Sequence, residues 1–249
     1  MWVWKERDSL NWATDPVTSY EELEATINAV DRWLVPYENP SLALMFRGQD
    51  TEAPLLSRPL EGLGRDTIKL ALEKMLVICR KHLDAQLSNE QIYFLMRHAG
   101  LPSMMVDWST SLNVALWFAI HTKQGIKTEG ASLWAIRPVV GMVKDLPTLY
   151  PADSMMCECS RRQDGFACYL HFAASKQGES GVLPMDRDPI YGRRLVRISI
   201  AGNYAQIEAE FLAIDPSLAG ITESDCPIPE DVVSECKNVF SDITGRSLQ

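Results

Sequence analysis

The sequence predicts an α+β fold, and two observations carry this prediction. Segments with helical periodicity precede and interrupt the strand-like segments irregularly, without the regular strand–helix–strand rhythm of a parallel α/β sheet. The 249 residues are 46% hydrophobic and 23% charged, which is typical of a globular chain that buries a sizeable core. We therefore expect an N-terminal arm over residues 1–18, followed by a single α+β domain over residues 19–249.

The first expected elements are an extended arm and a helix. Residues 1–17 are rich in tryptophan and are expected to pack as an arm or a strand. Residues 19–34 place apolar side chains on one helical face. Ser19 is the expected cap of this helix, and Glu22 three positions later completes a capping box. Pro36 follows and ends the helical pattern.

The next elements are a buried strand and three helices. The apolar run 42–46 is expected to form a buried strand that stops at Arg47, where a charged residue appears. Helical periodicity spans residues 66–87. A second helix is expected at 88–99, where a serine and a glutamine three positions later form a capping pair. Residues 113–121 are almost wholly apolar in the middle and are expected to form a buried helix.

Strands and helices also alternate irregularly in the rest of the chain. Residues 131–140 and 166–172 are expected to form strands. Residues 195–200 alternate between apolar and other side chains, as a half-buried strand does. Helices are expected at 206–214 and at 229–240.

Charge and cysteine usage limit the classes of function. The net charge of −9 disfavours a protein held on nucleic acid mainly by phosphate contacts, although a local basic cleft stays open. The six cysteines are irregularly spaced and no signal peptide is visible, so we expect free thiols in a reducing cytoplasm. Cys157 and Cys159 lack the two-residue spacer and the second pair of a zinc site, so no metal is expected. No apolar run is long enough to span a membrane.

Phe46-Arg47-Gly48-Gln49 is the first candidate site. An arginine at the end of an apolar strand needs a partner or an opening onto a cleft, because a buried unpaired guanidinium is very unfavourable. The neighbouring Gly48 allows a close approach to the backbone. Two interpretations stay open from the residues alone: an anion or nucleotide clamp, or a structural salt bridge to Asp50 or elsewhere.

A second candidate site lies just before the apolar helix. Asp107 could orient His98 or a ribose hydroxyl. Ser109, Thr110 and Ser111 directly precede the helix, where hydroxyls cap free N–H groups and an anion can dock. Plain capping is the alternative interpretation. A Ser–His–Asp triad from Ser109, His98 and Asp107 also stays open, although the strained Gly-x-Ser-x-Gly elbow is absent.

Two further clusters are weaker candidates. Gln163 lies among two arginines and a carboxylate before a predicted strand, where a solvated turn and a functional site are equally open. Glu208 and Glu210 would share a face on a strand but not on a helix. Because their segment is predicted to be helical, we expect these two carboxylates to be solvated.

These motifs together resemble the FRG domain family, which is named for its Phe-Arg-Gly motif. Residues 46–49 are similar to that signature, and residues 97–109 to the family's longest motif, which ends in Asp-Trp-Thr. Residues 114–119 are similar to the helix that follows it, and residues 163–166 to a late Gln-x-Gly-x-Phe step. The family's usual glutamine before the histidine is replaced by Arg97, and the arginine of its longest motif is also absent, so no role of either residue is carried over.

The resemblance implies a single FRG-type domain with an ADP-ribosyltransferase-like fold, which is a split β-sheet core with N-terminal and inserted helices. It implies that Arg47 and Gly48 bind NAD at a phosphate or ribose. It further implies that Ser109, Thr110 and Ser111 brace the nicotinamide pocket.

The resemblance also implies the catalytic residues. Arg47, His98, Asp107 and Gln163 are the expected set. Catalysis would consist mainly of positioning and of electrostatic stabilisation of an oxocarbenium-like ribose. Gln163 or Gly165 falls at the position of the usual late glutamate, so the carboxylate that holds the ribose 2′-hydroxyl or activates the acceptor stays open among Asp107, Glu158, Asp164 and Glu210. Asp107 is the first choice because of its proximity to the other motif residues.

The expected function is that of an NAD-dependent ADP-ribosyltransferase toxin of bacterial anti-phage defence. One type of family member is a toxin that ADP-ribosylates RNA in a toxin–antitoxin–chaperone system. The expected partners are therefore NAD, a macromolecular acceptor that is RNA or protein, and an antitoxin protein. A non-catalytic nucleotide- or partner-sensing module is the alternative, and a hydrolase that uses His98 is a third.

Overall fold

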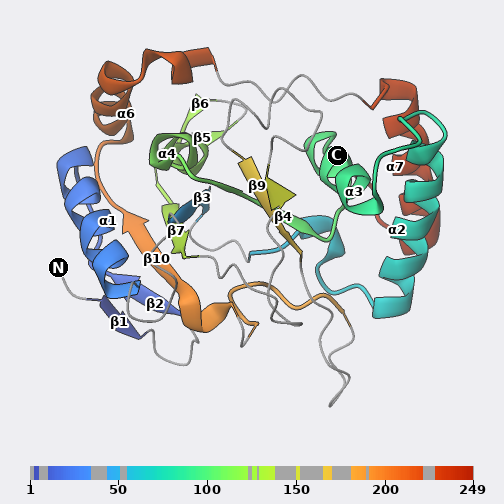
Figure 1. Cartoon of the computed structure of the whole chain (residues 1–249), viewed down its shortest axis with the longest axis horizontal. Coiled ribbons are helices and arrows are strands. Elements are labelled where there is room, and N and C mark those ends of the chain that lie inside the picture. Colours follow the sequence, from blue (N-terminus) through green and yellow to red (C-terminus); the bar gives the residue numbers. More distant parts are fainter. Residues whose placement is uncertain are drawn as a thin grey trace.

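The protein has an α+β architecture, as the sequence predicts, in which one large sheet lies between two groups of helices (Figure 1). The structure is a computed structural model. It describes residues 3–5, 11–34, 44–50, 55–122, 125–127, 129–137, 150–151, 165–169, 181–188, 191–220 and 228–248.

The described strands form an eight-stranded sheet and one separate two-stranded pair. In sheet order the eight strands are β1 (Val3–Lys5), β2 (Trp12–Thr14), β10 (Leu195–Ile200), β7 (Ala131–Ile136), β3 (Met45–Asp50), β4 (Met105–Ser109), β9 (Gly165–Tyr169) and β8 (Tyr150–Pro151). Only the contact between β2 and β10 is parallel among these neighbours. The separate pair is β5 (His121–Thr122) with β6 (Gly125–Ile126). Part of the N-terminal arm is therefore extended, and it forms the β1 edge of the large sheet.

Two groups of helices cover the sheet. The first comprises α1 (Tyr20–Leu34), α4 (Leu112–Ile120) and α6 (Tyr204–Ile214). The second comprises α2 (Arg65–Arg80), α3 (Asn89–His98) and α7 (Glu230–Thr244), which stand together on the right of Figure 1. Short 3-10 turns occupy Arg58–Leu60, Gly192–Arg194 and Pro216–Gly220. None of the described helices combines the length and the apolar character that crossing a bilayer requires.

The apolar side chains form one core on each face of the sheet. Along β7, Leu133 and Ala135 pack with α1, α4 and α6, whereas Trp134 and Ile136 pack with α2, α3 and α7. This alternation follows from the two-residue period of a strand. The same period puts Met45 and Phe46 of β3 in opposite cores. Both faces of the central strands are therefore buried, and a charged side chain there needs a partner within the protein.

The capping signals of two helices are confirmed, one of them in part. Ser88 caps α3, and its exchange of hydrogen bonds with Gln91 is a complete capping box. Ser19 accepts a hydrogen bond from the Glu22 backbone, as expected. The Glu22 carboxylate, however, accepts from the backbone N–H and the hydroxyl of Thr18 instead of the Ser19 amide. The box is thus shifted by one residue, because Thr18 offers the carboxylate two donors.

Several expected elements differ from the structure, among them the last helix, which ends at Thr244 and not at residue 240. Helix α2 ends at Arg80 and not near residue 87, because the Arg80 guanidinium donates to Leu87 O and to Asn89 Oδ1 and so fastens the intervening loop. Strand β3 does not stop at Arg47 but continues to Asp50, since its whole length pairs with β7. Strand β4 was not predicted at all. The expected strand 195–200 is confirmed.

The sheet is least continuous between β3 and β4. Strand β3 pairs with β7 along its whole length, and β4 pairs with β9 along its whole length. Between β3 and β4, in contrast, the single paired position is Phe46 with Ser109. We call Phe46, Arg47, Asp107 and Ser109 the β3–β4 junction, and the candidate site is built around it.

Candidate functional site

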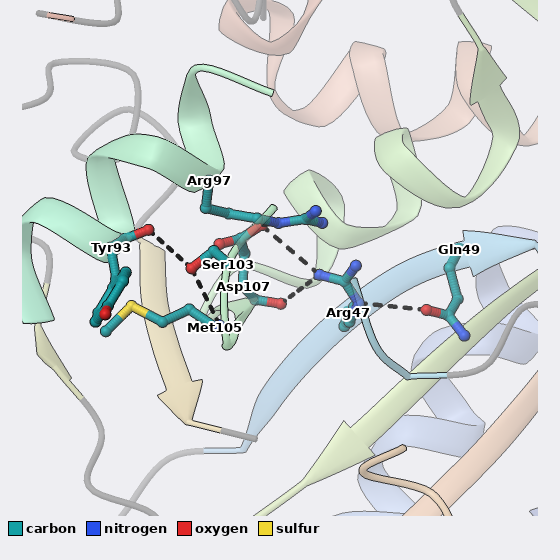
Figure 2. A network of polar contacts seen from close by, with 7 residues as sticks. All are labelled: Arg47, Gln49, Tyr93, Arg97, Ser103, Met105 and Asp107. Atoms are coloured by element: carbon teal, nitrogen blue, oxygen red, sulfur yellow. Dashed lines mark hydrogen bonds and ion pairs between the residues drawn. The ribbon is translucent and has the colours of Figure 1, made fainter. Parts of the chain in front are cut away.

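Arg47 lies one residue beyond the only paired position of β3 and β4. Its Nη1 donates a hydrogen bond to Asp107 O at 2.7 Å and lies 3.9 Å from Asp107 Oδ2 (Figure 2). Its Nε donates to Gln49 Oε1 at 3.3 Å. The guanidinium thus provides the Asp107 carbonyl with a donor at a point where the backbones of the two strands no longer pair. Among the described contacts, the carboxylate near Arg47 is that of Asp107; the side chain of Asp50 lies outside the described residues.

A second arginine, which the sequence analysis did not select, binds the same carboxylate. Arg97 lies in the last turn of α3, and its Nε donates to Asp107 Oδ2 at 2.9 Å. Figure 2 shows Arg47 and Arg97 reaching Asp107 from different elements, β3 and α3. The family motif has a glutamine at this position, so the resemblance assigned no role to Arg97. One sequence feature could have indicated the contact: Arg97 lies in the last turn of a predicted helix, ten positions before Asp107.

The charge of Asp107 is set by these neighbours. Burial raises the pKa of the Asp107 carboxyl, but Arg97, His98 and Arg47, together with the hydrogen bond from Arg97, outweigh burial and lower it below its ordinary value. Asp107 is therefore a carboxylate at neutral pH. Its Oδ1 is buried and accepts no hydrogen bond from any described residue. One oxygen of this carboxylate is held by Arg97, and the other has acceptor capacity left.

His98 lies beside the cluster but is not oriented by Asp107. Its ring packs on Phe94, with ring centroids 4.4 Å apart, and its Nε2 is buried without a hydrogen-bond partner among the described residues. Ser109 Oγ accepts from Ser111 N at 3.0 Å. Ser109, His98 and Asp107 consequently form no hydrogen-bonded triad in the described part of the chain, which removes the geometric basis of the hydrolase alternative.

The three hydroxyl residues lie where the sequence placed them, directly before the apolar helix. Ser109 pairs with Phe46 across the junction, so this segment is adjacent to Arg47. Ser111 is the N-cap of α4, and its Oγ accepts from Val114 N at 3.3 Å. The capping interpretation is therefore confirmed for Ser111. Thr110 is partly exposed. A role of these hydroxyls around nicotinamide stays a prediction.

Helix α4 packs directly against Gly48. A Cβ at this position would overlap Ala115 O and Ala119 N of helix α4. The glycine thus lets α4 lie directly against β3, and it fixes the helix that Ser111 begins. This packing explains the glycine without a ligand, and its predicted contact with NAD stays a prediction.

The late segment of the candidate site is described only in part. Gly165 pairs with Ser109, so β9 enters the sheet beside the junction. Gln163, two positions earlier, lies outside the described residues, as do Cys157 and Cys159.

The expectation that Glu208 and Glu210 are solvated was wrong for Glu208 and holds only in part for Glu210, which is partly exposed. Glu208 Oε1 lies 2.7 Å from His121 Nε2, and both side chains are mostly buried. Glu210 accepts hydrogen bonds from the backbone of Tyr20 at 3.0 Å and from Gln206 Nε2 at 3.0 Å. Both carboxylates have partners in the protein because α6 packs against both α4 and α1. They join helices and do not belong to the Asp107 cluster.

Comparison with models of protein families finds the FRG domain over residues 42–127. The matched segment contains β3, α3, β4 and α4, and hence Arg47, Arg97 and Asp107. No curated protein and no solved structure matches the chain.

Proposed function

Since the chain is a member of the FRG domain family, with the domain at residues 42–127, we propose that it is an NAD-dependent ADP-ribosyltransferase. The proposed reaction breaks the bond between nicotinamide and ribose and transfers ADP-ribose to a macromolecular acceptor, RNA or protein. The proposal places NAD at the β3–β4 junction, with the split sheet core of an ADP-ribosyltransferase around it.

One observation carries the proposal. Two segments far apart in the chain meet where the sheet is least continuous, through the 2.7 Å hydrogen bond from Arg47 to Asp107 O. Guanidinium groups and a carboxylate at one place suit a nucleotide. The cations favour its phosphates, and carboxylate oxygens accept hydrogen bonds from ribose hydroxyls.

The chemistry of the cluster favours electrostatic catalysis over general-base catalysis. When nicotinamide leaves, positive charge develops on the ribose. The Asp107 carboxylate supports that charge best if it stays ionised, and its lowered pKa keeps it so. A carboxylate with a lowered pKa is at the same time a weak base. In the proposed mechanism, Asp107 Oδ1 accepts from a ribose hydroxyl, and the positive charges of Arg47 and Arg97 favour the phosphates. The acceptor attacks C1′ as the bond to nicotinamide breaks, and it loses its proton to solvent.

The biological role in the proposal comes from the family resemblance. A transferase that modifies RNA or protein and consumes NAD harms its own cell, so we propose a cytoplasmic toxin of anti-phage defence that an antitoxin restrains. Expression of the chain without a partner should arrest bacterial growth, and Arg47→Ala should abolish the arrest. Harmless expression of the folded chain contradicts the toxin role.

The decisive assay follows a label on the adenylate half of NAD. The protein is incubated with labelled NAD and cell extract, and the RNA and protein fractions are counted alongside released nicotinamide. We expect transfer and release by the natural chain, loss of both in Arg47→Ala, and no loss in Arg32→Ala, which removes an exposed arginine from the end of α1. If a non-hydrolysable NAD analogue binds but the protein releases no nicotinamide from labelled NAD, the chain is the non-catalytic module instead. If the protein neither binds the analogue nor releases nicotinamide, both the transferase and the nucleotide-binding module are contradicted.

A further inference from the structure

Arg97 has unused hydrogen-bonding capacity at the cluster. Its Nε is taken by Asp107 Oδ2, while Nη1 and Nη2 form no hydrogen bond or ion pair with any described residue. Arg47, in contrast, is held by Asp107 O and by Gln49. The Arg97 side chain is also the more exposed of the two, at 27% against 15%. Of the two guanidinium groups, that of Arg97 can meet a ligand without losing any contact that it makes with the described residues.

Two arginines of the cluster share one carboxylate. Both guanidinium groups approach the same carboxylate oxygen, at 2.9 Å for Arg97 and 3.9 Å for Arg47, so the two cations lie close together (Figure 2). Both guanidinium groups are only partly exposed, and at such a place an anion interacts with them more strongly than it does in bulk water. Burial raises the pKa of the Asp107 carboxyl, but the positive potential of Arg97, His98 and Arg47 outweighs burial and lowers it.

The geometry of Arg97 suits a phosphate group. Arginine has five N–H donors in a planar fork, and the hydrogen bond from Nε to Asp107 fixes the plane of the guanidinium without using either Nη. The two Nη atoms can then donate together to two oxygens of one phosphate. A carboxylate that holds an arginine in this way also reduces the conformational freedom lost on binding.

We propose that Arg97, held in position by Asp107, binds the diphosphate of the nucleotide that occupies the β3–β4 junction. The inference rests on the proposed function for the presence of a nucleotide there, but it requires only binding and no transfer. It assigns a specific task to the residue that replaces the family's usual glutamine. The two arginines then have different roles: Arg97 contacts the phosphates, whereas Arg47 holds β3 and β4 together.

The test compares two probes that differ only in phosphate, ADP and adenosine. Isothermal titration calorimetry measures their affinities for the natural chain, for Arg97→Gln and for Lys74→Gln. The last variant removes one positive charge from an exposed position of α2. We expect Arg97→Gln to weaken ADP binding about tenfold or more, the effect of a lost bidentate phosphate contact, and to leave adenosine binding unchanged. Lys74→Gln should bind both probes as the natural chain does. Added salt should weaken ADP binding less in Arg97→Gln than in the natural chain.

The outcomes separate this inference from the proposed function. Equal ADP affinity of Arg97→Gln and the natural chain, or no ADP binding at all, overturns the inference. If the natural chain cleaves NAD but Arg97→Gln binds ADP normally, the transferase proposal holds and the phosphate contact of Arg97 is contradicted. If ADP binding depends on Arg97 but no nicotinamide is released, the inference survives alone. Arg97→Lys guards against misfolding: it keeps the charge, and it should show an intermediate loss of ADP affinity because lysine has no fork.

Discussion

Arg47 binds Asp107 through its backbone carbonyl and not primarily through its carboxylate. The Nη1 atom is 2.7 Å from Asp107 O and 3.9 Å from Asp107 Oδ2. Asp107 Oδ2 consequently accepts its hydrogen bond from Arg97. Asp107 Oδ1 accepts none from the described residues. This arrangement makes Arg47 part of the sheet and Asp107 part of the site, and the first prediction follows from it.

Replacing Arg47 by lysine should destabilise the fold even though the charge is kept. A lysine cannot donate to Asp107 O and Gln49 Oε1 from one rigid plane, so at least one of the two hydrogen bonds is lost. We expect a loss of about 1 to 2 kcal/mol in the free energy of unfolding, measured by urea titration. Lys74→Arg is the reverse exchange at an exposed position of α2, and it should leave the free energy of unfolding unchanged. An unchanged stability of Arg47→Lys contradicts the joining role of the guanidinium.

Gly48→Ala should be strongly destabilising. The added Cβ would overlap backbone atoms of Ala115 and Ala119, which cannot move aside as the end of a flexible side chain can. We expect a loss of about 3 kcal/mol or more in the free energy of unfolding. Gly62→Ala is the matched control. Its positive φ of 69° makes alanine strained there, but the nearest atom belongs to the side chain of Arg246 at 3.7 Å, so the cost should stay near 1 to 2 kcal/mol. Equal costs contradict the close approach of α4 to Gly48.

Asp107→Asn should change how stability depends on pH. The folded-state pKa of Asp107 lies below the ordinary value of 3.8, since Arg97, His98 and Arg47 outweigh burial. Its contribution to stability is therefore present above that ordinary value and is lost as pH falls through the folded-state pKa. At pH 7 the variant should lose about 1 to 3 kcal/mol, and the difference from the natural chain should shrink below about pH 4. Asp84→Asn, in an exposed loop, should leave the profile unchanged. A difference that stays constant down to pH 2 contradicts the ionised state of Asp107.

His121 and Glu208 should be energetically coupled. Their atoms Nε2 and Oε1 lie 2.7 Å apart, and the His121 ring also stacks on Trp117, with centroids 4.5 Å apart and planes 14° from parallel. A double-mutant cycle with His121→Ala and Glu208→Ala should give a coupling of about 1 kcal/mol in the free energy of unfolding. Additive single-mutant effects show instead that the contact contributes nothing to stability.

Local signals predicted much of the fold. The Ser88–Gln91 capping pair and the alternation over residues 195–200 depend on neighbouring residues alone, and both are confirmed. Strand β4 was missed because its sequence, Met105–Ser109, contains an aspartate and directly precedes a helix. Its extended conformation is supported by pairing with β9, a contact between distant parts of the chain that no local pattern encodes.

The candidate site was predictable in its parts but not in its connections. Arg47 and Asp107 were singled out as residue types at suggestive positions, yet the carbonyl that joins them could not be foreseen. Arg97 was set aside because the family motif has glutamine there. Its importance comes from the return of the chain from α3 into β4, which brings position 97 back to position 107. Likewise, Glu208 was assigned to solvent because His121, its partner, lies far away in the sequence.

Hydrogen–deuterium exchange with and without a non-hydrolysable NAD analogue tests the central claim most directly, since it reports where on the chain the nucleotide binds. The account predicts slower exchange in peptides that cover β3, the end of α3 and the segment from β4 into α4. It predicts weaker protection in Arg97→Gln at the same analogue concentration. Binding of the analogue with protection confined to α1 and α6, or with none at the β3–β4 junction, would contradict it.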